Sequence, residues 1–462
     1  MGWTQVVNLA RRLAEYAVSV RYRAIDARTV KEMKARVVDA LGCAIGAYHE
    51  KPIAMARRAV LGLRSGGGSS IIGAGRRSSP DLATFVNGFM LRYFDYNDTY
   101  LSKEPAHPSD NIAPCLAVAE AEGSTGKELI SAAVTAYEVQ CRLCDAADLR
   151  HRGWDHVNYG LVSSSLAASK LMRLDAERAE QAVNIAVNSH LAMRQVRAGE
   201  LSMWKGASFA NAARNGVFAA FLAREGVTGP SPVFEGEMGF FKQVSGPFDL
   251  DTGGFGGRGG RYKVRETYVK YWPAEYHAQS AIWAALAVRE GLKGPGDVES
   301  VLVETHEAGY SILGKDPEKW RPATKETADH SLPYMVGMAL LEGKIDNGTY
   351  SERKLRSERA LRFLQKVKVE EDPALTALYP ARGMANRVTV VTRSGATLSK
   401  KVDVPRGHPL DPMGREELEQ KFLALTAGKL PTGRAKELLG LLWNLEGVED
   451  LGEVVSLMRV ST

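Results

Sequence analysis

Several polar residues lie close together between Tyr93 and Asn111, where the chain reads YFDYNDTYLSKEPAHPSDN. The stretch contains Asp95, Thr99 and His107, and two prolines break it. Proline fixes φ and does not continue a helix, so we expect the residues from Thr99 onward to form a loop of fixed shape. A histidine near a carboxylate can act as a general acid or base, because a partner on one ring nitrogen sets the tautomer. The alternative is a solvated acidic loop with a structural histidine.

Further ionisable side chains interrupt apolar segments elsewhere in the chain. Each has a plain structural explanation, since a lysine near a helix start is usually solvated and a single histidine is often a hydrogen-bonded core residue. Their occurrence together is less readily explained in this way. The residues are His156 in RGWDHVNYG, Lys205 in SMWKGASF, Lys270 and Glu275 in VKYWPAEYHAQ, and His330 and Tyr334 in TADHSLPYMVG.

The composition is that of an ordinary globular chain. Of its 462 residues, 45% are hydrophobic, which is enough for two or so domains, because single cores stop growing at about 250–300 residues. Sixty Lys and Arg residues against 54 Asp and Glu residues give a net charge of +6, without a basic run that would mark a nucleic-acid arm. This mild positive charge favours a small anionic substrate over nucleic acid.

Cysteine content and hydropathy indicate the compartment. Four cysteines in so long a chain cannot form a disulfide framework, and Arg11, Arg12 and Glu15 interrupt the first apolar stretch, so we expect no signal peptide. The chain offers no window of roughly 20 uninterrupted apolar residues, the length that a membrane span needs. We therefore expect a cytoplasmic protein that does not enter the membrane.

Apolar residues recur at helical spacing through about the first 265 residues. These segments are rich in Ala, Gly and Ser, which let helix axes approach closely, so we expect a compact all-helical domain. The predicted helices are Val30–Tyr48, Leu129–Ala147, Val162–Met172, Ala176–His190 and Ala207–Glu225.

After Lys270 the pattern changes to β-branched, partly alternating runs mixed with helices. The predicted strands are Ser300–Thr305, Lys366–Glu370 and Arg387–Thr392, with a fourth ending at Val402, and the predicted helices are Ala278–Glu290 and Tyr334–Glu342. From Leu410 onward the pattern is helical again. The expected fold is mainly α: an all-helical domain formed by residues 1–268 and 406–462, with a smaller α+β lid domain inserted at 269–405.

Several longer motifs resemble the MmgE/PrpD family over nearly the whole chain. They are DALGCAIGA at Asp39–Ala47, FDYNDTYL, HPSDN, SMWKG with NAARNG, KYWPAEYHAQSA, KWRPATKETADHSLPYMV and GHPLDPMGREELEQKF. The resemblance implies a helical domain built from both termini, a smaller α+β lid and an active site between them. It also implies a homodimer and chemistry without a metal or an organic cofactor.

The resemblance assigns site residues position by position. Asp95, Thr99, His107, His156, Lys205, Lys270 and Tyr334 fall where relatives have active-site groups. Decarboxylase-type members resemble KRFPAH where this chain has KYWPAE, so Glu275 replaces a histidine. This departure, with the HPSDN and TADHSLPY forms, favours dehydration of 2-methylcitrate, and of citrate as a further candidate, over decarboxylation.

Dehydration of a 2-hydroxy tricarboxylate explains these residue types. A base must remove a weakly acidic C–H proton while an acid protonates the departing hydroxyl, and fixed cations must offset the growing negative charge. We expect Asp95 and His107 to be the acid–base pair and Lys205, Lys270 and a protonated His156 to be the cations. Tyr334 is then a proton donor or carboxylate ligand on the lid. Thr99, Lys270 and Glu275 are predicted to bind substrate, and the residue that takes the carbon-bound proton stays open.

Other classes of protein compete with this interpretation. An aconitase-like hydro-lyase would hold an iron–sulfur cluster, for which Cys141, Cys144 and Cys115 are candidates, but YEVQCRLCDAADL is typical of one amphipathic helix with core cysteines. A cis-aconitate decarboxylase or a dicarboxylate epimerase or isomerase of the same family is a second alternative. A non-catalytic dimeric paralogue is a third, because fold does not fix function.

Overall fold

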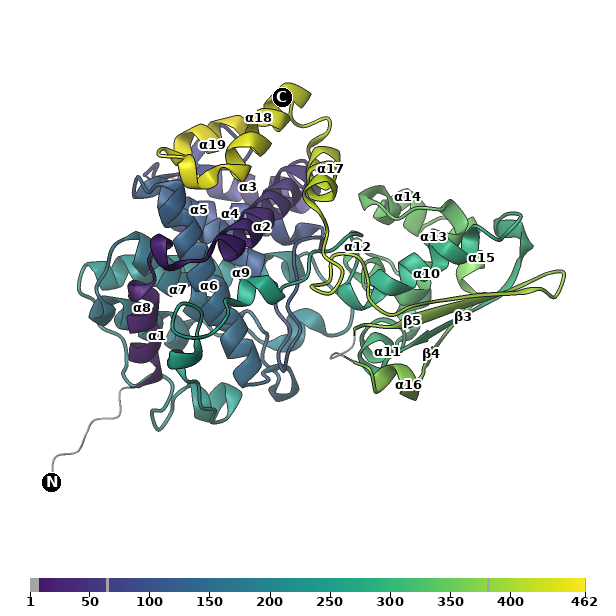
Figure 1. Cartoon of the computed structure of the whole chain (residues 1–462), viewed down its shortest axis with the longest axis horizontal. Helices are drawn as coiled ribbons and strands as arrows, with labels where there is room; N and C mark the ends of the chain where they lie inside the picture. Colours follow the sequence, from purple (N-terminus) through teal and green to yellow (C-terminus); the bar gives the residue numbers. More distant parts are fainter. Residues whose placement is uncertain (1–7, 64–65, 380–382, 462) are drawn as a thin grey trace.

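Most of the helices belong to one mainly α part, whose arrangement Figure 1 shows in purple to teal. The computed structural model describes residues 8–63, 66–379 and 383–461. A short antiparallel hairpin of β1 (Ser69–Ile71) and β2 (Arg76–Ser78) accompanies the helices. The helices are α1 (Leu9–Ser19), α2 (Ala27–Gly46), α3 (Lys51–Leu61), α4 (Pro80–Tyr93), α5 (Ile112–Ala121), α6 (Gly126–Ala146), α7 (Asn158–Leu171), α8 (Ala176–Ser189) and α9 (Trp204–Arg224).

Local sequence explains where these helices begin. The Asp26 side chain accepts the N–H of Thr29 at the start of α2, and Asp175 caps α8 in the same way. Thr125 and Glu128 form a capping box at the start of α6. Each cap satisfies backbone N–H groups that have no partner within the helix. The predicted helices are therefore found, most of them beginning a few residues earlier than the apolar pattern alone indicated.

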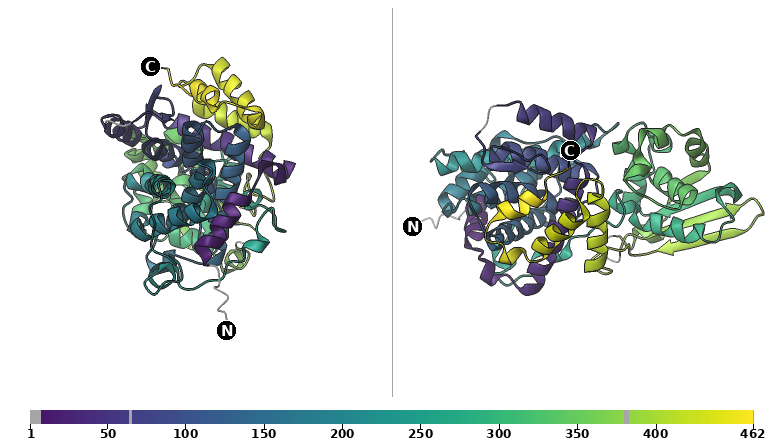
Figure 2. Two further views of the ribbon diagram at one scale, coloured as in Figure 1. Left: turned by 90° about the vertical axis from the view of Figure 1, so that its left-hand side faces the viewer. Right: turned by 90° about the horizontal axis from the view of Figure 1, so that it is seen from above.

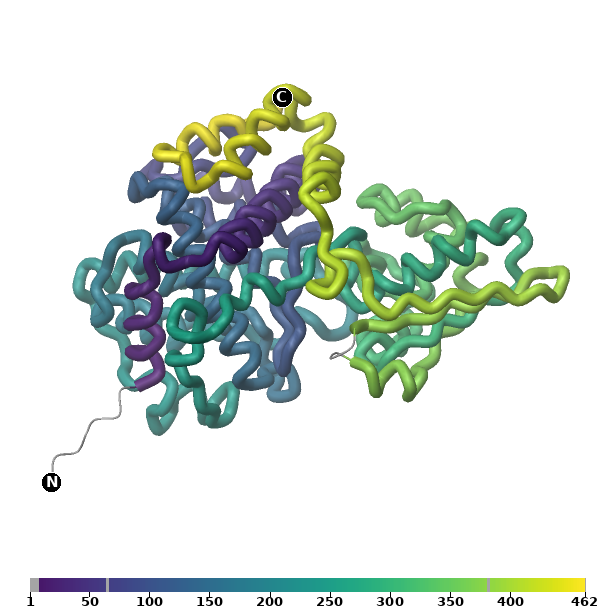
Figure 3. The backbone as a smooth tube through the Cα atoms, in the orientation of Figure 1, coloured from purple at the N-terminus to yellow at the C-terminus, as the bar shows by residue number. Residues whose placement is uncertain are grey.

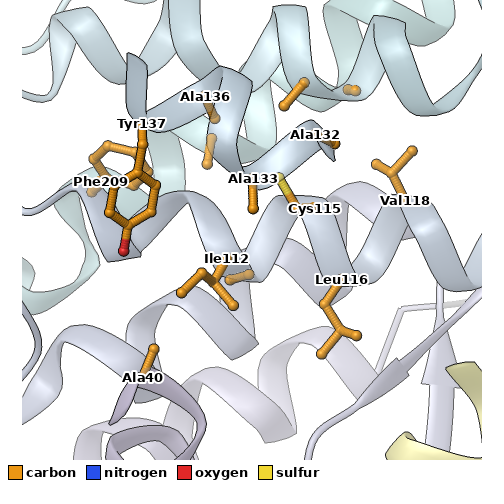
Figure 4. Packing of buried hydrophobic residues seen from close by; sticks show 14 of the residues in the cluster. Ala40, Ile112, Cys115, Leu116, Val118, Ala132, Ala133, Ala136, Tyr137 and Phe209 are labelled. Atoms are coloured by element: carbon orange, nitrogen blue, oxygen red, sulfur yellow. The ribbon is translucent and has the colours of Figure 1, made fainter. Parts of the chain in front are cut away.

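Small residues let these helices pack closely, as Figure 4 shows around α5 and α6. Ala132, Ala133 and Ala136 lie on the part of α6 that faces Cys115 and Ile112 of α5. Where α7 crosses α9, a Cβ on Gly160 would lie only 2.4 Å from the Phe209 ring. Larger side chains would separate the axes, so the Ala- and Gly-rich composition is a packing requirement.

A separate α+β part follows, with its own apolar core. Its four-stranded sheet has the order β4-β3-β5-β6, with β3 and β4 parallel and the other pairs antiparallel. The strands are β3 (Val298–Thr305), β4 (Val367–Glu371), β5 (Asn386–Thr392) and β6 (Thr397–Val402). The helices are α10 (Gln279–Arg289), α11 (Glu307–Leu313), α12 (Lys325–Ala328), α13 (Leu332–Glu342), α14 (Glu352–Leu355), α15 (Glu358–Leu364) and α16 (Pro373–Thr376).

The last helices return to the first part of the chain, as the tube in Figure 3 and the view from above in Figure 2 show. These helices are α17 (Arg415–Thr426), α18 (Thr432–Trp443) and α19 (Leu451–Leu457). Phe422 of α17 packs so closely on α2 that a Cβ on Gly42 would lie 3.1 Å from its ring. The chain thus has a mainly α fold with a small α+β part, as expected, and the boundaries after residues 268 and 405 stay predictions.

Two further expectations concern cysteines and membranes. All four cysteines, Cys43, Cys115, Cys141 and Cys144, are free and buried. Cys141 and Cys144 lie on α6, where burial raises their pKa values well above the usual range. Among the described helices, none combines the length and apolar character needed to cross a membrane.

Candidate active site

Asp95 lies at the centre of the candidate site, just after α4 ends. Its φ is +51°, a left-handed conformation that is unfavourable for a residue other than glycine. Lys270 holds this conformation, because its Nζ donates to the Asp95 carbonyl oxygen at 2.8 Å and to Asp95 Oδ1 at 2.6 Å. Strained backbone of this kind persists only where surrounding contacts fix it. The side chain of Lys270 is fully buried, so its ammonium is committed to Asp95.

Two further cations surround the Asp95 carboxylate. Arg92 Nη1 lies 2.6 Å from Oδ1, and Lys205 Nζ lies 3.2 Å from Oδ2. Burial acts to raise the pKa of Asp95, but Arg92, Lys270 and Lys205 together hold it well below its usual range. The carboxylate is therefore ionised at neutral pH and serves to organise positive charge.

His107 is not paired directly with Asp95, contrary to the expected acid–base pair. Arg92 lies between them, with Nη2 donating to His107 Nε2 at 2.8 Å. The other ring nitrogen, Nδ1, lies 2.8 Å from the Asp98 carbonyl oxygen and 3.2 Å from Thr99 Oγ1. A carbonyl only accepts, so Nδ1 carries the proton and Nε2 is the acceptor. Burial, reinforced by Arg92, lowers the pKa of His107 well below its usual value, which makes the ring neutral.

Lys205 joins this cluster to the α+β part. It lies at the start of α9, as expected, and its Nζ is 3.2 Å from Asp329 Oδ1 and 3.0 Å from His330 Nδ1. Lys325 Nζ donates to the other Asp329 oxygen at 2.6 Å. Burial opposes ionisation of Asp329, but Lys205 and Lys325 outweigh it and lower its pKa. The cluster therefore crosses from one core to the other.

His330 contacts Asp329 at this junction, and its side chain is 15% exposed. Its Nδ1 lies 2.7 Å from Asp329 Oδ1, and its Nε2 lies 3.4 Å from Asp95 Oδ2. Burial and the nearby Lys205 lower the pKa of His330, so the ring is neutral at neutral pH. A neutral imidazole between two carboxylates can accept a proton, and both carboxylates would stabilise the resulting cation.

Asp95, Asp329 and His330 could in principle hold a metal ion, because one ligand atom of each lies within 4.8 Å of the others. Lys205 Nζ lies 3.0 to 3.2 Å from atoms of all three. The ammonium thus occupies the position that a metal ion would take. A cation that bound the same atoms would have to compete with Lys205.

His156 is placed near His107, with ring centroids 5.7 Å apart, but it is not a cation. Burial lowers its pKa to about 3, which overturns the expectation of a protonated His156. Positive charge comes instead from Arg197, whose Nη2 donates to His156 Nε2 at 2.9 Å and whose Nε donates to Asp155 at 2.8 Å. Nδ1 of His156 therefore carries the proton, and it has no hydrogen-bond partner among the described residues.

Glu275 and Tyr334 are both turned toward partners in their own α+β part. Glu275 accepts from the His277 backbone N–H at 2.7 Å and contacts His277 Nδ1 at 2.8 Å. Burial opposes its ionisation, but His277 lowers its pKa to about 2. The buried Tyr334 hydroxyl donates to the Thr349 carbonyl at 2.7 Å. This contact engages the hydroxyl that was expected to donate a proton or bind a substrate carboxylate.

The structure thus assembles Asp95, Thr99, His107, Lys205 and Lys270 with residues that the sequence prediction had not assigned. Arg92, Asp329 and Arg197 were not predicted, and His330 was noted without a role. A signal existed for two of them: Arg92 directly follows the apolar run Phe89–Leu91 and lies three residues before Asp95, and Asp329 adjoins His330 in TADHSLPY.

The fold and the site define a class of protein: mainly helical, with a buried acid–base cluster that joins two apolar cores. The model of the MmgE/PrpD N-terminal domain matches residues 11–253, and that of the MmgE/PrpD C-terminal domain matches residues 272–446. The chain therefore belongs to the MmgE/PrpD family.

Relatives with curated names are similar over most of the chain. It is 30% identical over 427 residues to the 2-methylcitrate dehydratase of Salmonella typhimurium, covering 87% of each chain, and the same values hold for that of Escherichia coli. It is 30% identical over 437 residues to a 2-methylcitrate dehydratase-like protein of Aspergillus oryzae, covering 88% of this chain and 86% of the relative.

Proposed function

We propose that this protein is a hydro-lyase that dehydrates 2-methylcitrate, or a close hydroxytricarboxylate, by acid–base elimination without a metal or an organic cofactor. The observation that carries the proposal is the contact of neutral His330 with both Asp329 and Lys205 where the two parts of the chain meet. Base, orienting carboxylate and fixed cation are the groups that removal of a proton beside a carboxylate requires. The names of the relatives support the substrate class.

In the proposed reaction, His330 accepts the carbon-bound proton. Asp329 holds one side of the ring, and both Asp329 and Asp95 stabilise the imidazolium that forms. Lys205 offsets the negative charge that develops on the substrate carboxylate. As the C–O bond breaks, the imidazolium returns its proton to the departing hydroxyl, so the products are an alkene and water. Asp95, His107 and His156 stay catalytic candidates, and Tyr334 is the weakest of the predicted set.

Arginines beside His156 are suited to bind the other carboxylates. Arg194 and Arg197 lie on one short helical turn, and burial lowers the pKa of Arg194 while neighbouring Arg197 and Arg150 act in the same direction. Guanidinium groups that crowd together gain from an anion between them. Thr99, Lys270 and Glu275 are proposed to shape the site, Lys270 by holding Asp95.

The absence of a metal requirement is part of the proposal, and the position of Lys205 supports it. An ammonium that contacts Asp95, Asp329 and His330 supplies the positive charge that a metal ion would supply. It also neutralises the ligands that the ion would need.

A direct assay tests the proposal. The protein is incubated with 2-methylcitrate, citrate and cis-aconitate while the ultraviolet absorbance of the conjugated alkene and the release of carbon dioxide are followed. Alkene formation from a hydroxy acid without carbon dioxide is the expected result. Carbon dioxide from cis-aconitate would select decarboxylation, and exchange of the carbon-bound proton without alkene would select an epimerase or isomerase.

We also propose that the protein is a homodimer. Large apolar side chains are exposed around the start of α9 and along it: Met203 is 45% exposed, Trp204 49% and Phe218 50%. Trp204 and Phe218 are separated by about four helical turns and so share a face of α9. An apolar face of this kind is typical of an interface. Light scattering should give a dimer, and Phe218→Glu should shift it toward monomer.

A further inference from the structure

Lys421 of α17, the first of the three last helices, is buried beneath the candidate site, with a side chain 4% exposed. Its Nζ lies 2.6 Å from Asp39 Oδ1 of α2. It also donates to the Tyr96 carbonyl oxygen at 2.9 Å and to the Lys270 carbonyl oxygen at 2.8 Å. Two hydrogen bonds and one ion pair therefore join α17, α2 and two loop segments at the Lys421 ammonium.

The two carbonyl groups belong to the segments that carry Asp95 and Lys270. Tyr96 directly follows Asp95, whose left-handed backbone depends on the hydrogen bonds from Lys270 Nζ. A single ammonium thus fixes both sides of the Asp95–Lys270 contact. Moving either carbonyl would change the distance between the Asp95 carboxylate and the Lys270 ammonium.

Packing alone does not hold these segments in place. A cavity of about 560 Å³ lies against them, lined by Phe94, Tyr96, Tyr271, Trp272 and Lys421 among others. Side chains next to a cavity lack neighbours on one face and can shift more readily than those in a filled core. The hydrogen bonds from Lys421 therefore hold these two segments in place, as close packing holds segments elsewhere in the protein.

The electrostatics also indicate a positioning role. Asp39 is fully buried, and burial raises its pKa while Lys421 opposes the rise. The Tyr96 ring lies 3.6 Å from Lys421 Nζ, which adds a cation–π contact. Desolvation makes a buried ion pair a poor source of stability compared with apolar side chains of similar size. The geometry that the pair imposes on its two backbone acceptors is then its main effect.

We propose that Lys421, with Asp39 as its counter-charge, is a positioning residue that sets the Asp95–Lys270 contact of the candidate site. The inference rests on the proposed function only for its kinetic readout. The geometric claim is independent of which reaction the site performs.

The test uses the double variant Asp39→Asn/Lys421→Met, which removes both charges and so leaves no unpaired ion buried. The matched control is Lys34→Met/Glu446→Gln. Lys34 also joins α2 to the C-terminal segment, with Nζ 2.6 Å from Glu446 Oε1 and 2.7 Å from the Trp443 carbonyl oxygen, but its contacts do not include Tyr96 or Lys270. Both variants are compared by thermal melting, steady-state kinetics and crystal structure.

The expected result is a kcat about 10²-fold lower for the test variant, the usual effect of a misplacement of about 1 Å, and a near-normal kcat for the control. The Asp95–Lys270 contact should lengthen in the crystal structure of the test variant only. A weaker contact leaves more of the Asp95 negative charge facing His330, so the pKa of His330, and with it the acid limb of the kcat/KM profile, should move to higher pH.

Several outcomes would overturn the inference. Equal kcat values for the test and control variants, with the Asp95–Lys270 distance unchanged, would make Lys421 a structural residue only. If the wild type dehydrates no substrate, the proposed function fails, and the crystallographic distance alone decides the positioning role. If the double variant does not fold, Lys421→Arg replaces it: this variant keeps the charge but changes the donor geometry, and an unchanged contact and kcat would count against the proposal.

Discussion

Replacement of Lys205 by methionine removes the ammonium that lies 3.2 Å from Asp95 Oδ2 and from Asp329 Oδ1. Each pair at this distance has a Coulomb energy of about 5 kcal/mol at an effective dielectric constant of 20, most of which desolvation offsets. Asp95 keeps Arg92 and Lys270, and Asp329 keeps Lys325. We therefore expect a loss of about 3 kcal/mol in the free energy of unfolding, the low end for breaking a buried pair.

The effect of Lys205→Met on catalysis should be larger. Loss of the cation that offsets the developing charge should lower kcat by about 10²–10³-fold. Lys205 also helps to lower the pKa of His330, so its removal raises that pKa. A base with a higher pKa is protonated at higher pH, and the acid limb of kcat/KM should move upward in pH.

The assay is a pH series of steady-state kinetics with urea unfolding, and Lys325→Met is the control. Lys325 contacts Asp329 at 2.6 Å and donates to the Tyr93 carbonyl oxygen. The control should lose stability without the same movement of the acid limb. A Lys205→Met protein with the wild-type kcat and pH profile would refute the assignment of Lys205 to the reacting site.

Three further predictions follow from single contacts. Turnover should survive exhaustive EDTA treatment, because Lys205 occupies the place of a cation among Asp95, Asp329 and His330; loss of turnover with rescue by one divalent ion would contradict this. Burial lowers the pKa of His156 from 6.5 to about 3. Between these two pH values the histidine is protonated in the unfolded state but not in the folded state, so the free energy of unfolding falls by about 4–5 kcal/mol as the pH drops. His156→Gln should flatten this fall in acid unfolding titrations, whereas the exposed His151→Gln should not, and identical curves would exclude His156 as the cause. Tyr334→Phe should lower the free energy of unfolding by about 1–2 kcal/mol, because the hydrogen bond to Thr349 is lost, and should leave kcat within about threefold of the wild-type value. A fall in kcat of about 10²-fold would return Tyr334 to the catalytic set.

Local patterns were sufficient to predict most of the fold. The apolar spacing in Ala176–His190 corresponds to α8, and the β-branched run Arg387–Thr392 lies within β5. Helix starts were less well predicted, because capping residues such as Thr125 lie before the apolar pattern begins.

The candidate site was only partly predictable, since its contacts join distant parts of the chain. Lys205 meets Asp329 across 124 positions, and no spacing rule pairs them. Protonation states depend on the same contacts: His156 was expected to be charged, but burial next to Arg197 makes it neutral. Lys421 lies in the family motif GREELEQKF, and its role becomes visible only when its two carbonyl partners are in place.

The most direct test of the account compares His330→Asn with the exposed His151→Asn in single-turnover dehydration of 2-methylcitrate. His330 contacts Asp329 and Lys205 at the junction of the two parts, whereas the His151 side chain is 72% exposed. If His330 is the proton acceptor, its variant should form alkene about 10²–10⁴-fold more slowly with an unchanged melting profile, and the control should match the wild type. A folded His330→Asn protein that forms alkene at the wild-type rate would contradict the central claim.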